Sequence, residues 1–133
     1  MKKFLTLILV CLITCCCFIF AGCAPSGTYK FKCLKYEDSN NSITCNVGDK
    51  YNGVTLTKDS FILIFNDDNT GVFRTELTYE NAKTKKEVAI GEWMQGYKDE
   101  IYLTYNNQTY TATKDGNTII MEISNGVYVT FTK

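Results

Sequence analysis

The chain has 133 residues, with 14 lysines and arginines, 14 aspartates and glutamates, and no histidine. This length suits one domain, and the balanced charge provides no basic stripe, so we expect no nucleic-acid partner. Without histidine there is no Ser-His or Cys-His pair, so we expect no enzyme, and only a pair of distant carboxylates is left open as a catalytic alternative.

The first 22 residues carry the pattern of a secretory signal. Met1-Lys2-Lys3 is positively charged, and the 17 residues from Phe4 to Phe20 contain no charge. A positive start, an apolar middle and small residues at the end predict a signal peptide over 1–22. The apolar run also reaches the lower limit for a membrane span, so an uncleaved transmembrane anchor is the alternative.

Phe20-Ala21-Gly22-Cys23 lies at the border between apolar and polar sequence and resembles the lipobox of bacterial lipoproteins, with Phe20 where leucine is commonest. The resemblance implies that Cys23 carries the lipid and becomes N-terminal after cleavage. The predicted tether over 23–27 is short, since its last four residues span at most roughly 14 Å. We therefore expect a domain held by acyl chains on the extracytoplasmic face of the cell membrane.

Beyond the tether, short β-rich runs alternate with turn residues such as Asp115-Gly116 and Asn125-Gly126. Asparagine, aspartate and glycine tolerate positive φ, so these pairs predict tight turns. Between the first two predicted strands lies a long polar connection. The predicted strands are Thr28–Tyr36, Thr55–Thr57, Phe61–Asn66, Val72–Glu80, Glu87–Gln95, Ile101–Asn106, Thr109–Lys114, Thr118–Ser124 and Val127–Thr132.

Alternation of apolar and polar residues assigns the faces of several strands. The outward sets are rich in threonine, as expected where one face of a sheet meets water. The predicted inward residues are Phe73, Leu77, Tyr79, Ile101, Leu103, Tyr105, Ile119, Met121, Ile123, Val127, Val129 and Phe131. The fold class is therefore all-β, an antiparallel meander of about eight strands that forms a small barrel or half-barrel. Such a barrel is either filled by its own side chains or holds one small ligand.

The tripeptide Gly-Thr-Tyr at 27–29 is similar to the Gly-x-Trp start of lipocalin-like barrels, and Gly-Glu-Trp at 91–93 repeats the pattern. With the turn NDDNTG and the closing run YTATKDGNTIIMEISNGVYVTFTK, the chain resembles the small lipocalin-like lipoproteins of low-GC Gram-positive bacteria. Lipocalins proper place an arginine of the last strand against the tryptophan, whereas here Lys133 is the nearby cation. The resemblance implies a lipocalin-like β domain over 28–133 and weakly implies ligand binding.

Four aromatic residues are candidates for either a ligand site or the core: Tyr29, Trp93, Tyr105 and Phe131. Packing is the simpler interpretation, because aromatic side chains bury large apolar areas.

Cys33 and Cys45 are the thiols that remain beside Cys23 in the predicted mature chain. Disulfides persist outside the cytosol, so a bond between them is one alternative, and a free Cys33 buried in the first strand is the other. We expect no metal and no cofactor, since two thiols without histidine make a poor zinc site. The segment 67–71 lacks the ligand order of a calcium loop and is interpreted as a turn.

Two functions are compatible with these patterns. The first is a membrane-anchored lipoprotein whose barrel binds a small apolar or amphipathic ligand. The second is a solid-core structural or interaction lipoprotein that meets another protein of the cell envelope and has no small-molecule ligand. An apolar cavity of roughly 300 Å³ or more favours the first function.

Overall fold

The computed structural model describes residues 24–133, and every helix or strand assigned in this range is a β-strand, which confirms the all-β prediction. The strands are β1 (Gly27–Glu37), β2 (Ser42–Asn46), β3 (Lys50–Tyr51), β4 (Val54–Thr55), β5 (Phe61–Phe65), β6 (Thr70–Thr78), β7 (Thr84–Gln95), β8 (Glu100–Tyr105), β9 (Gln108–Asp115), β10 (Thr118–Ser124) and β11 (Val127–Thr132). The predicted signal peptide over 1–22 and Cys23 lie outside the described residues.

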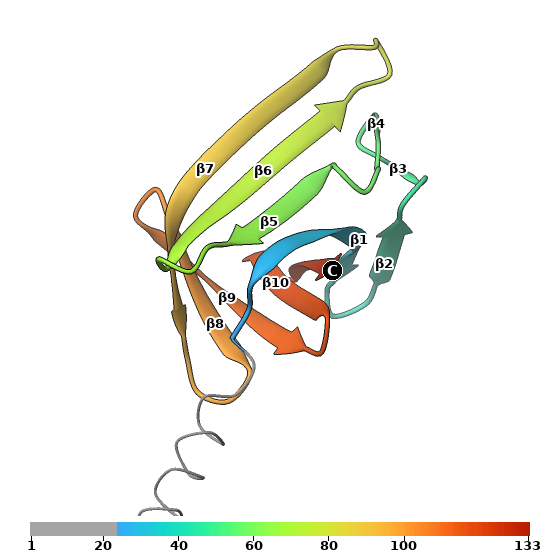
Figure 1. Ribbon diagram of the computed structural model, residues 1–133. Helices are drawn as coiled ribbons and strands as arrows, with labels where there is room; N and C mark the ends of the chain where they lie inside the picture. Colours follow the sequence, from blue (N-terminus) through green and yellow to red (C-terminus); the bar gives the residue numbers. More distant parts are fainter. Residues whose placement is uncertain (1–23) are drawn as a thin grey trace, which may run out of the picture.

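Eight of these strands close into an antiparallel barrel (Figure 1). Strands β5 to β11 follow one another as a meander, and β1 pairs with both β5 and β11, which closes the ring. The predicted meander of about eight strands is thus confirmed, as a closed barrel and not a half-barrel. Closure pairs the two edges that an open sheet would expose. Strand β2 pairs beside the second half of β1, and β3 and β4 form a separate hairpin.

Tight turns with left-handed residues connect the later strands. Asn106 and Asn107, between β8 and β9, have φ values of 50° and 62°. Gly116 and Gly126, in the next two turns, have φ values of 59° and 76°. Asparagine and glycine adopt these angles at low cost, which is why turn residues locate the strands here. The predicted bounds of the last two strands agree with those of β10 and β11.

The segment 37–54 is not the plain polar connection that the sequence indicates. It contains β2, β3 and the first residue of β4, and the strand expected at 55–57 is reduced to the two residues of β4. The apolar residues here are few and lie among charged and polar ones, so they produce little periodicity. Two of them, Cys45 and Val54, nevertheless point inward and join the core, as does Leu56 just after β4.

A β-bulge reverses the face pattern of β1. The register between β1 and β11 shifts by one residue between Phe31 and Cys33, so Lys32 is the inserted residue. Tyr29 and Phe31 are buried before the bulge, and Leu34 is buried after it. An extra residue shifts the alternation of a strand by one. Cys33 is therefore only half-buried and lies outside the core, which corrects the alternative of a buried Cys33.

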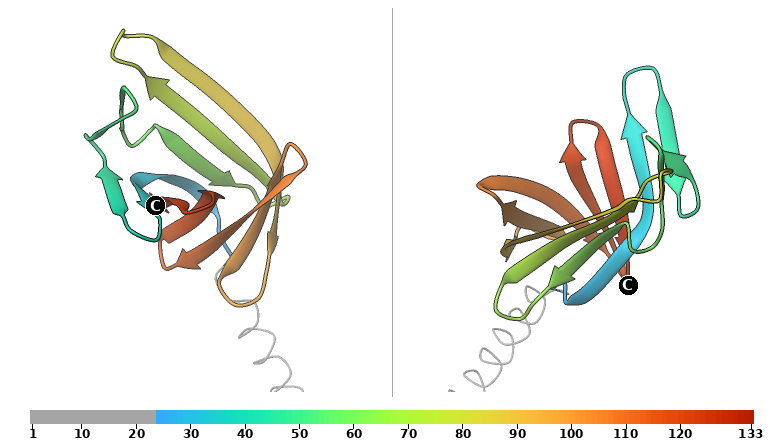
Figure 2. Two further views of the ribbon diagram at one scale, coloured as in Figure 1. Left: turned by 180° about the vertical axis from the view of Figure 1, so that it is seen from behind. Right: turned by 90° about the horizontal axis from the view of Figure 1, so that it is seen from above.

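Strand β7 changes its partner along its length. Residues 84–92 pair with β6, and residues 92–95 pair with β8. The β6–β7 hairpin therefore extends beyond the rest of the barrel, as Figures 1 and 2 show. Next to this change lies Gly91, where a Cβ atom would lie 1.9 Å from the backbone oxygen of Thr104. The strands approach so closely at this corner that only glycine fits.

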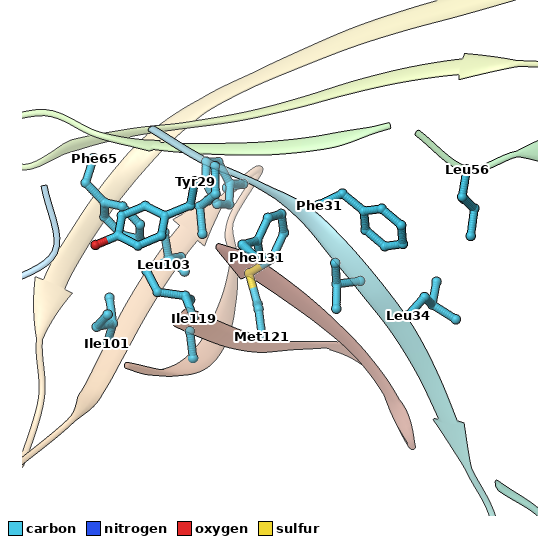
Figure 3. Packing of buried hydrophobic residues seen from close by; sticks show 14 of the residues in the cluster. Tyr29, Phe31, Leu34, Leu56, Phe65, Ile101, Leu103, Ile119, Met121 and Phe131 are labelled. Carbon is cyan, nitrogen blue, oxygen red and sulfur yellow. The ribbon is translucent and has the colours of Figure 1, made fainter. Parts of the chain in front are cut away.

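The two ends of the barrel differ. We call the end that carries Gly27 and the turns at 66–69 and 96–99 the floor, and the opposite end, which carries Glu37 and the β6–β7 turn, the mouth. Large side chains fill the interior from the floor upward, as Figure 3 shows. They are Tyr29, Phe31, Phe65, Ile101, Leu103, Tyr105, Ile119, Met121, Val129 and Phe131, each at most 5% exposed. Because the core and the whole closed sheet lie within 27–132, residues 24–133 form a complete folding unit.

Candidate functional site

An apolar pocket of about 300 Å³ lies at the mouth of the barrel. The mouth ends of five barrel strands surround it, together with the β3–β4 hairpin. The lining residues are Leu34, Tyr51, Asn52, Val54, Leu56, Phe61, Leu77, Tyr79, Ile123 and Val127. Its volume is at the lower limit of small-molecule pockets. The barrel is therefore filled at the floor and hollow at the mouth.

Residues 49–56, which we call the flap, cover one side of this pocket. The backbone N–H of Leu56 donates to the carbonyl oxygen of Asp49 at 2.8 Å, which closes the flap on itself. Val54 pairs in an isolated bridge with Tyr79, the residue after β6, which holds the flap against the barrel. The buried side chains of Val54 and Leu56 form the apolar underside of the flap, so the flap both lines and roofs the pocket.

The polar groups of the pocket are few and uncharged. Tyr51 and Asn52 from the flap and Tyr79, the residue after β6, bring two hydroxyls and one amide to the lining. Among the described residues, no charged side chain lines this pocket. A charged ligand group buried here would lose its hydration without gaining a partner. The arrangement therefore suits an apolar molecule with a neutral hydrogen-bonding group.

The four aromatic candidates from the sequence do not line this pocket. Tyr29, Tyr105 and Phe131 are buried in the core. Trp93 is half-buried near the floor, where its indole N–H donates to the backbone oxygen of Asn66 at 3.1 Å. Tyr29, Tyr105 and Phe131 thus lie at packing positions, whereas Trp93 also lines an open pocket together with Asp68 and Glu92.

The last residue of the chain meets the first strand at the floor. The ammonium of Lys133 lies 5.6 Å from the centroid of the Tyr29 ring, a cation–π contact. Burial raises the pKa of the Tyr29 hydroxyl above its ordinary value, so the ring stays neutral beside this cation. The cation of Lys133 thus lies against Tyr29.

Sequence reasoning found part of the pocket and missed the rest. Alternation assigned Leu77, Ile123 and Val127 to inward faces, though not to a cavity. The bulge hides Leu34, because the parity of β1 changes before it. Residues 49–54 of the flap lay within the segment interpreted as a polar connection, and its last two residues lay in the strand predicted at 55–57. The one usable signal was the Tyr-Asn-Gly turn at 51–53, followed by two apolar residues at a spacing of two.

Both cysteines of the described region are free. The pairing of β1 with β2 sets Cys33 opposite Asn46 and Leu34 opposite Cys45. Neighbouring residues of a strand point to opposite faces, so the two thiols lie on opposite sides of the sheet. The structure therefore has no disulfide between Cys33 and Cys45. Forming one would require β1 or β2 to turn over so that both thiols faced the same side of the sheet.

The segment 67–71 contains most of the turn between β5 and β6 and the first two residues of β6. One carboxylate oxygen of Asp68 accepts the backbone N–H of Thr70 at 3.0 Å and its hydroxyl at 2.6 Å. These hydrogen bonds hold the pKa of Asp68 below its ordinary value. Within residues 24–133, no group of three or more His, Cys, Asp or Glu side chains is arranged to hold a metal ion.

Comparison with known proteins finds no matching family, no matching curated protein and no matching solved structure. Within the described part of the chain, no helix has the length and apolar character needed to cross a membrane.

Proposed function

We propose that the protein is a lipoprotein anchored on the extracytoplasmic face of the cell membrane, and that its barrel mouth binds a small apolar or amphipathic molecule. The observation that carries the binding role is the uncharged pocket of about 300 Å³ under the flap. The anchor rests on the signal pattern of 1–22 and on the lipobox resemblance at Cys23. We propose no catalytic role, since the pocket lining contains no carboxylate, thiol or amine.

The anchor is tested by labelling bacteria that express the full chain with radioactive palmitate. Cys23→Ala is expected to abolish incorporation, because the thioether would have no sulfur to form on. Cys17→Ala, which also removes one cysteine near the predicted cleavage site, is the matched control and is expected to keep the label. Label retained in Cys23→Ala would contradict the anchor at this residue.

The pocket is tested by native mass spectrometry of residues 24–133 and by titration with 1-aminoanthracene, a neutral apolar dye. Leu77→Trp adds bulk inside the pocket and is expected to weaken dye binding about tenfold or more, equivalent to about 1.4 kcal/mol. Ile90→Trp places the same side chain on an exposed outward position and is the control. Thermal melts of both variants verify folding, and Val127→Phe provides a second way to fill the cavity.

One observation favours the solid-core interaction protein as a second candidate. On the outward face of β7, Val88, Ile90 and Met94 are 59%, 72% and 64% exposed. Such exposure is compatible with a protein partner on this face. A clean apo mass, together with dye binding that is equally weak in the original protein and in both filled variants, would replace the first candidate with the second.

A further inference from the structure

A second hollow lies on the outside of the barrel, along the floor half of β1. It is an open groove of about 500 Å³ between β1, the end of β2 and the loop that precedes β5. The lining residues are Thr28, Lys30, Phe31, Lys32, Asn46, Val47, Lys58, Thr132 and Lys133. The groove is separate from the mouth pocket, since the two share no lining residue.

The charge of this groove opposes that of the domain around it. Without residues 1–22, the chain has 12 basic against 14 acidic side chains, a net charge of −2. Four of those lysines line the groove, and no carboxylate side chain of the described region does so. Lys30 is paired with Asp59 at 2.8 Å, whereas Lys32 and Lys58 have no ion-pair partner among residues 24–133. The groove therefore has uncompensated positive charge.

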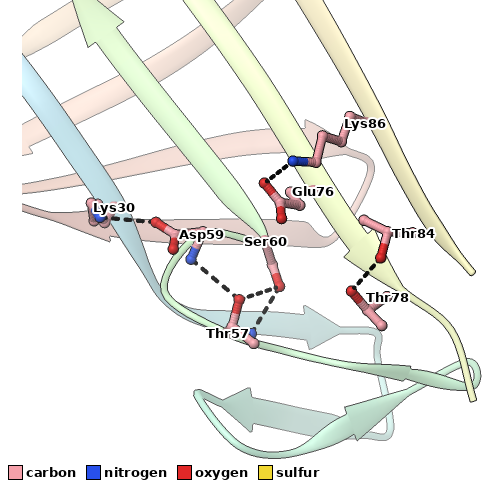
Figure 4. Close-up of polar contacts among 8 residues, drawn as sticks. All are labelled: Lys30, Thr57, Asp59, Ser60, Glu76, Thr78, Thr84 and Lys86. Atoms are coloured by element: carbon pink, nitrogen blue, oxygen red, sulfur yellow. Dashed lines mark hydrogen bonds and ion pairs between the residues drawn. The ribbon is translucent and has the colours of Figure 1, made fainter. Parts of the chain in front are cut away.

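The fold brings these lysines together from distant parts of the chain. The bulge inserts Lys32 into β1, and next to it the backbone N–H of Phe31 donates to the carbonyl oxygen of Lys58 at 3.1 Å. The loop that carries Lys58 is held by the buried hydroxyl of Ser60, which accepts the backbone N–H of Thr57 at 2.8 Å (Figure 4). Two segments separated by more than twenty residues are thus fixed at one groove.

The composition of the groove selects an amphipathic anion. Lysine ammonium groups, two threonine hydroxyls and one asparagine amide can all donate to phosphate oxygens. Val47, which is 43% exposed, and the methylene stems of the lysines provide apolar surface beside them, whereas Phe31 is buried beneath the groove. In a phospholipid, the phosphate would meet these donors, and the glycerol and the start of the acyl chains would meet the apolar surface.

We propose that this groove binds the phosphate of an anionic membrane lipid and so seats the barrel on the bilayer. Thr28 in the groove lies five residues after Cys23, a span of at most roughly 17 Å, so an anchored chain would keep the groove within reach of the headgroups. The orientation rests on the proposed anchor. The groove itself is tested without the anchor, because residues 24–133 form a complete folding unit.

The experiment measures sedimentation of residues 24–133 with vesicles of phosphatidylcholine, with and without phosphatidylglycerol. Binding is expected only with phosphatidylglycerol and is expected to weaken as salt rises. The double variant Lys32→Gln/Lys58→Gln is expected to bind about thirtyfold more weakly, about fivefold for each lysine. Lys83→Gln/Lys114→Gln makes the same change of charge away from the groove and is expected to bind like the original protein.

Equal loss of binding in both double variants, or no loss in the first, would overturn the proposal. Competition by inorganic phosphate and by glycerol phosphate distinguishes the sources of the anion. Phosphate binding that depends on Lys32 and Lys58, in the absence of vesicle binding, would reject the lipid as the ligand. Unchanged dye binding in Lys32→Gln/Lys58→Gln would show that the mouth pocket is intact in this variant. Palmitate labelling tests the anchor separately. Failure of the lipid groove, of the mouth pocket or of the anchor is therefore seen in a different measurement.

Discussion

At the scale of single residues, a pair of glycines makes room for one tyrosine. Gly71 and Gly91 are paired on neighbouring strands, and the ring of Tyr105 lies across them. A Cβ atom at Gly91 would lie 2.7 Å from the Tyr105 ring and 1.9 Å from the backbone oxygen of Thr104. At Gly71 the nearest atom would be the Tyr105 hydroxyl oxygen at 3.0 Å. The backbone obstacle at Gly91 cannot move without separating β7 from β8.

Gly91→Ala is therefore expected to destabilise the domain by about 3 kcal/mol, and Gly71→Ala by about 1 kcal/mol, as an overpacked core does. Urea unfolding followed by the fluorescence of Trp93, the single tryptophan, measures both values. Equal destabilisation by the two variants would contradict the close approach described at Gly91.

The hydroxyl of Tyr105 is buried and has no hydrogen-bond partner within the described residues. Burial raises its pKa well above the ordinary value of 10.0, because the phenolate would lose its hydration. In the unfolded chain this group ionises above about pH 10, whereas the folded state retains the proton. Its contribution to stability is therefore fully present below pH 10 and is lost as pH rises above 10.

Tyr105→Phe is expected to be as stable as the original protein at pH 8, or up to about 1 kcal/mol more stable, since it removes an unpaired buried group. Between pH 8 and 11 the variant is expected to lose about 1 kcal/mol less stability than the original. Urea midpoints at the two pH values measure the difference. The pKa of Tyr29 is also raised, but that residue is present in both proteins and cancels. A parallel loss in the two proteins would show that the Tyr105 hydroxyl is solvated.

At the scale of elements, the bulge in β1 decides which thiol is accessible. Cys33 is half-buried outside the core, and Cys45 is 8% exposed within it. A thiol reagent is therefore expected to modify Cys33 in the folded domain and Cys45 only after unfolding. With residues 24–133, Ellman's reagent is expected to detect one rapidly reacting thiol in buffer and two in urea. Cys33→Ser is expected to remove the rapidly reacting thiol. No reactive thiol in urea without a reductant would instead indicate a disulfide.

The elements also differ in how far the sequence predicts them. Strands β8 to β11 are short, alternate cleanly and are separated by Asn-Asn, Asp-Gly and Asn-Gly turns, so local rules locate them within about one residue. Strands β2 to β4 have few apolar residues. They form because β1 offers an edge to β2 and because Val54 and Leu56 bury their side chains against the barrel. Pairing with a distant strand supplies what local propensity lacks.

At the scale of the whole molecule, the filled floor and the hollow mouth should differ in local stability. The flap is held to β6 by few contacts, and the ion pair of Lys50 with Glu80, at 3.2 Å, is exposed. Amides of 50–55 and 79–83 are expected to exchange with deuterium well before those of Leu103 and Val129, whose side chains are fully buried. Hydrogen exchange with mass spectrometry measures this order. Equal protection of the flap and the floor would contradict a flap that opens independently.

The amino-acid sequence by itself determined the features that depend on near neighbours. These are the strand and turn sequence from Phe61 onward and the inward faces that carry Ile101 and Phe131, while the signal peptide at 1–22 stays a prediction. Each arises from side-chain polarity or backbone preference within a few residues, so it is visible without the fold.

Only the tertiary structure decided the pairing of β1 with β11, the bulge at Lys32, the position of the flap and the gathering of Lys32 with Lys58. All four depend on contacts between segments far apart in the chain. Their free energy comes from burial and pairing across the barrel, which no local window of residues contains. For that reason the pocket at the mouth and the lysine groove emerge only once the barrel has closed.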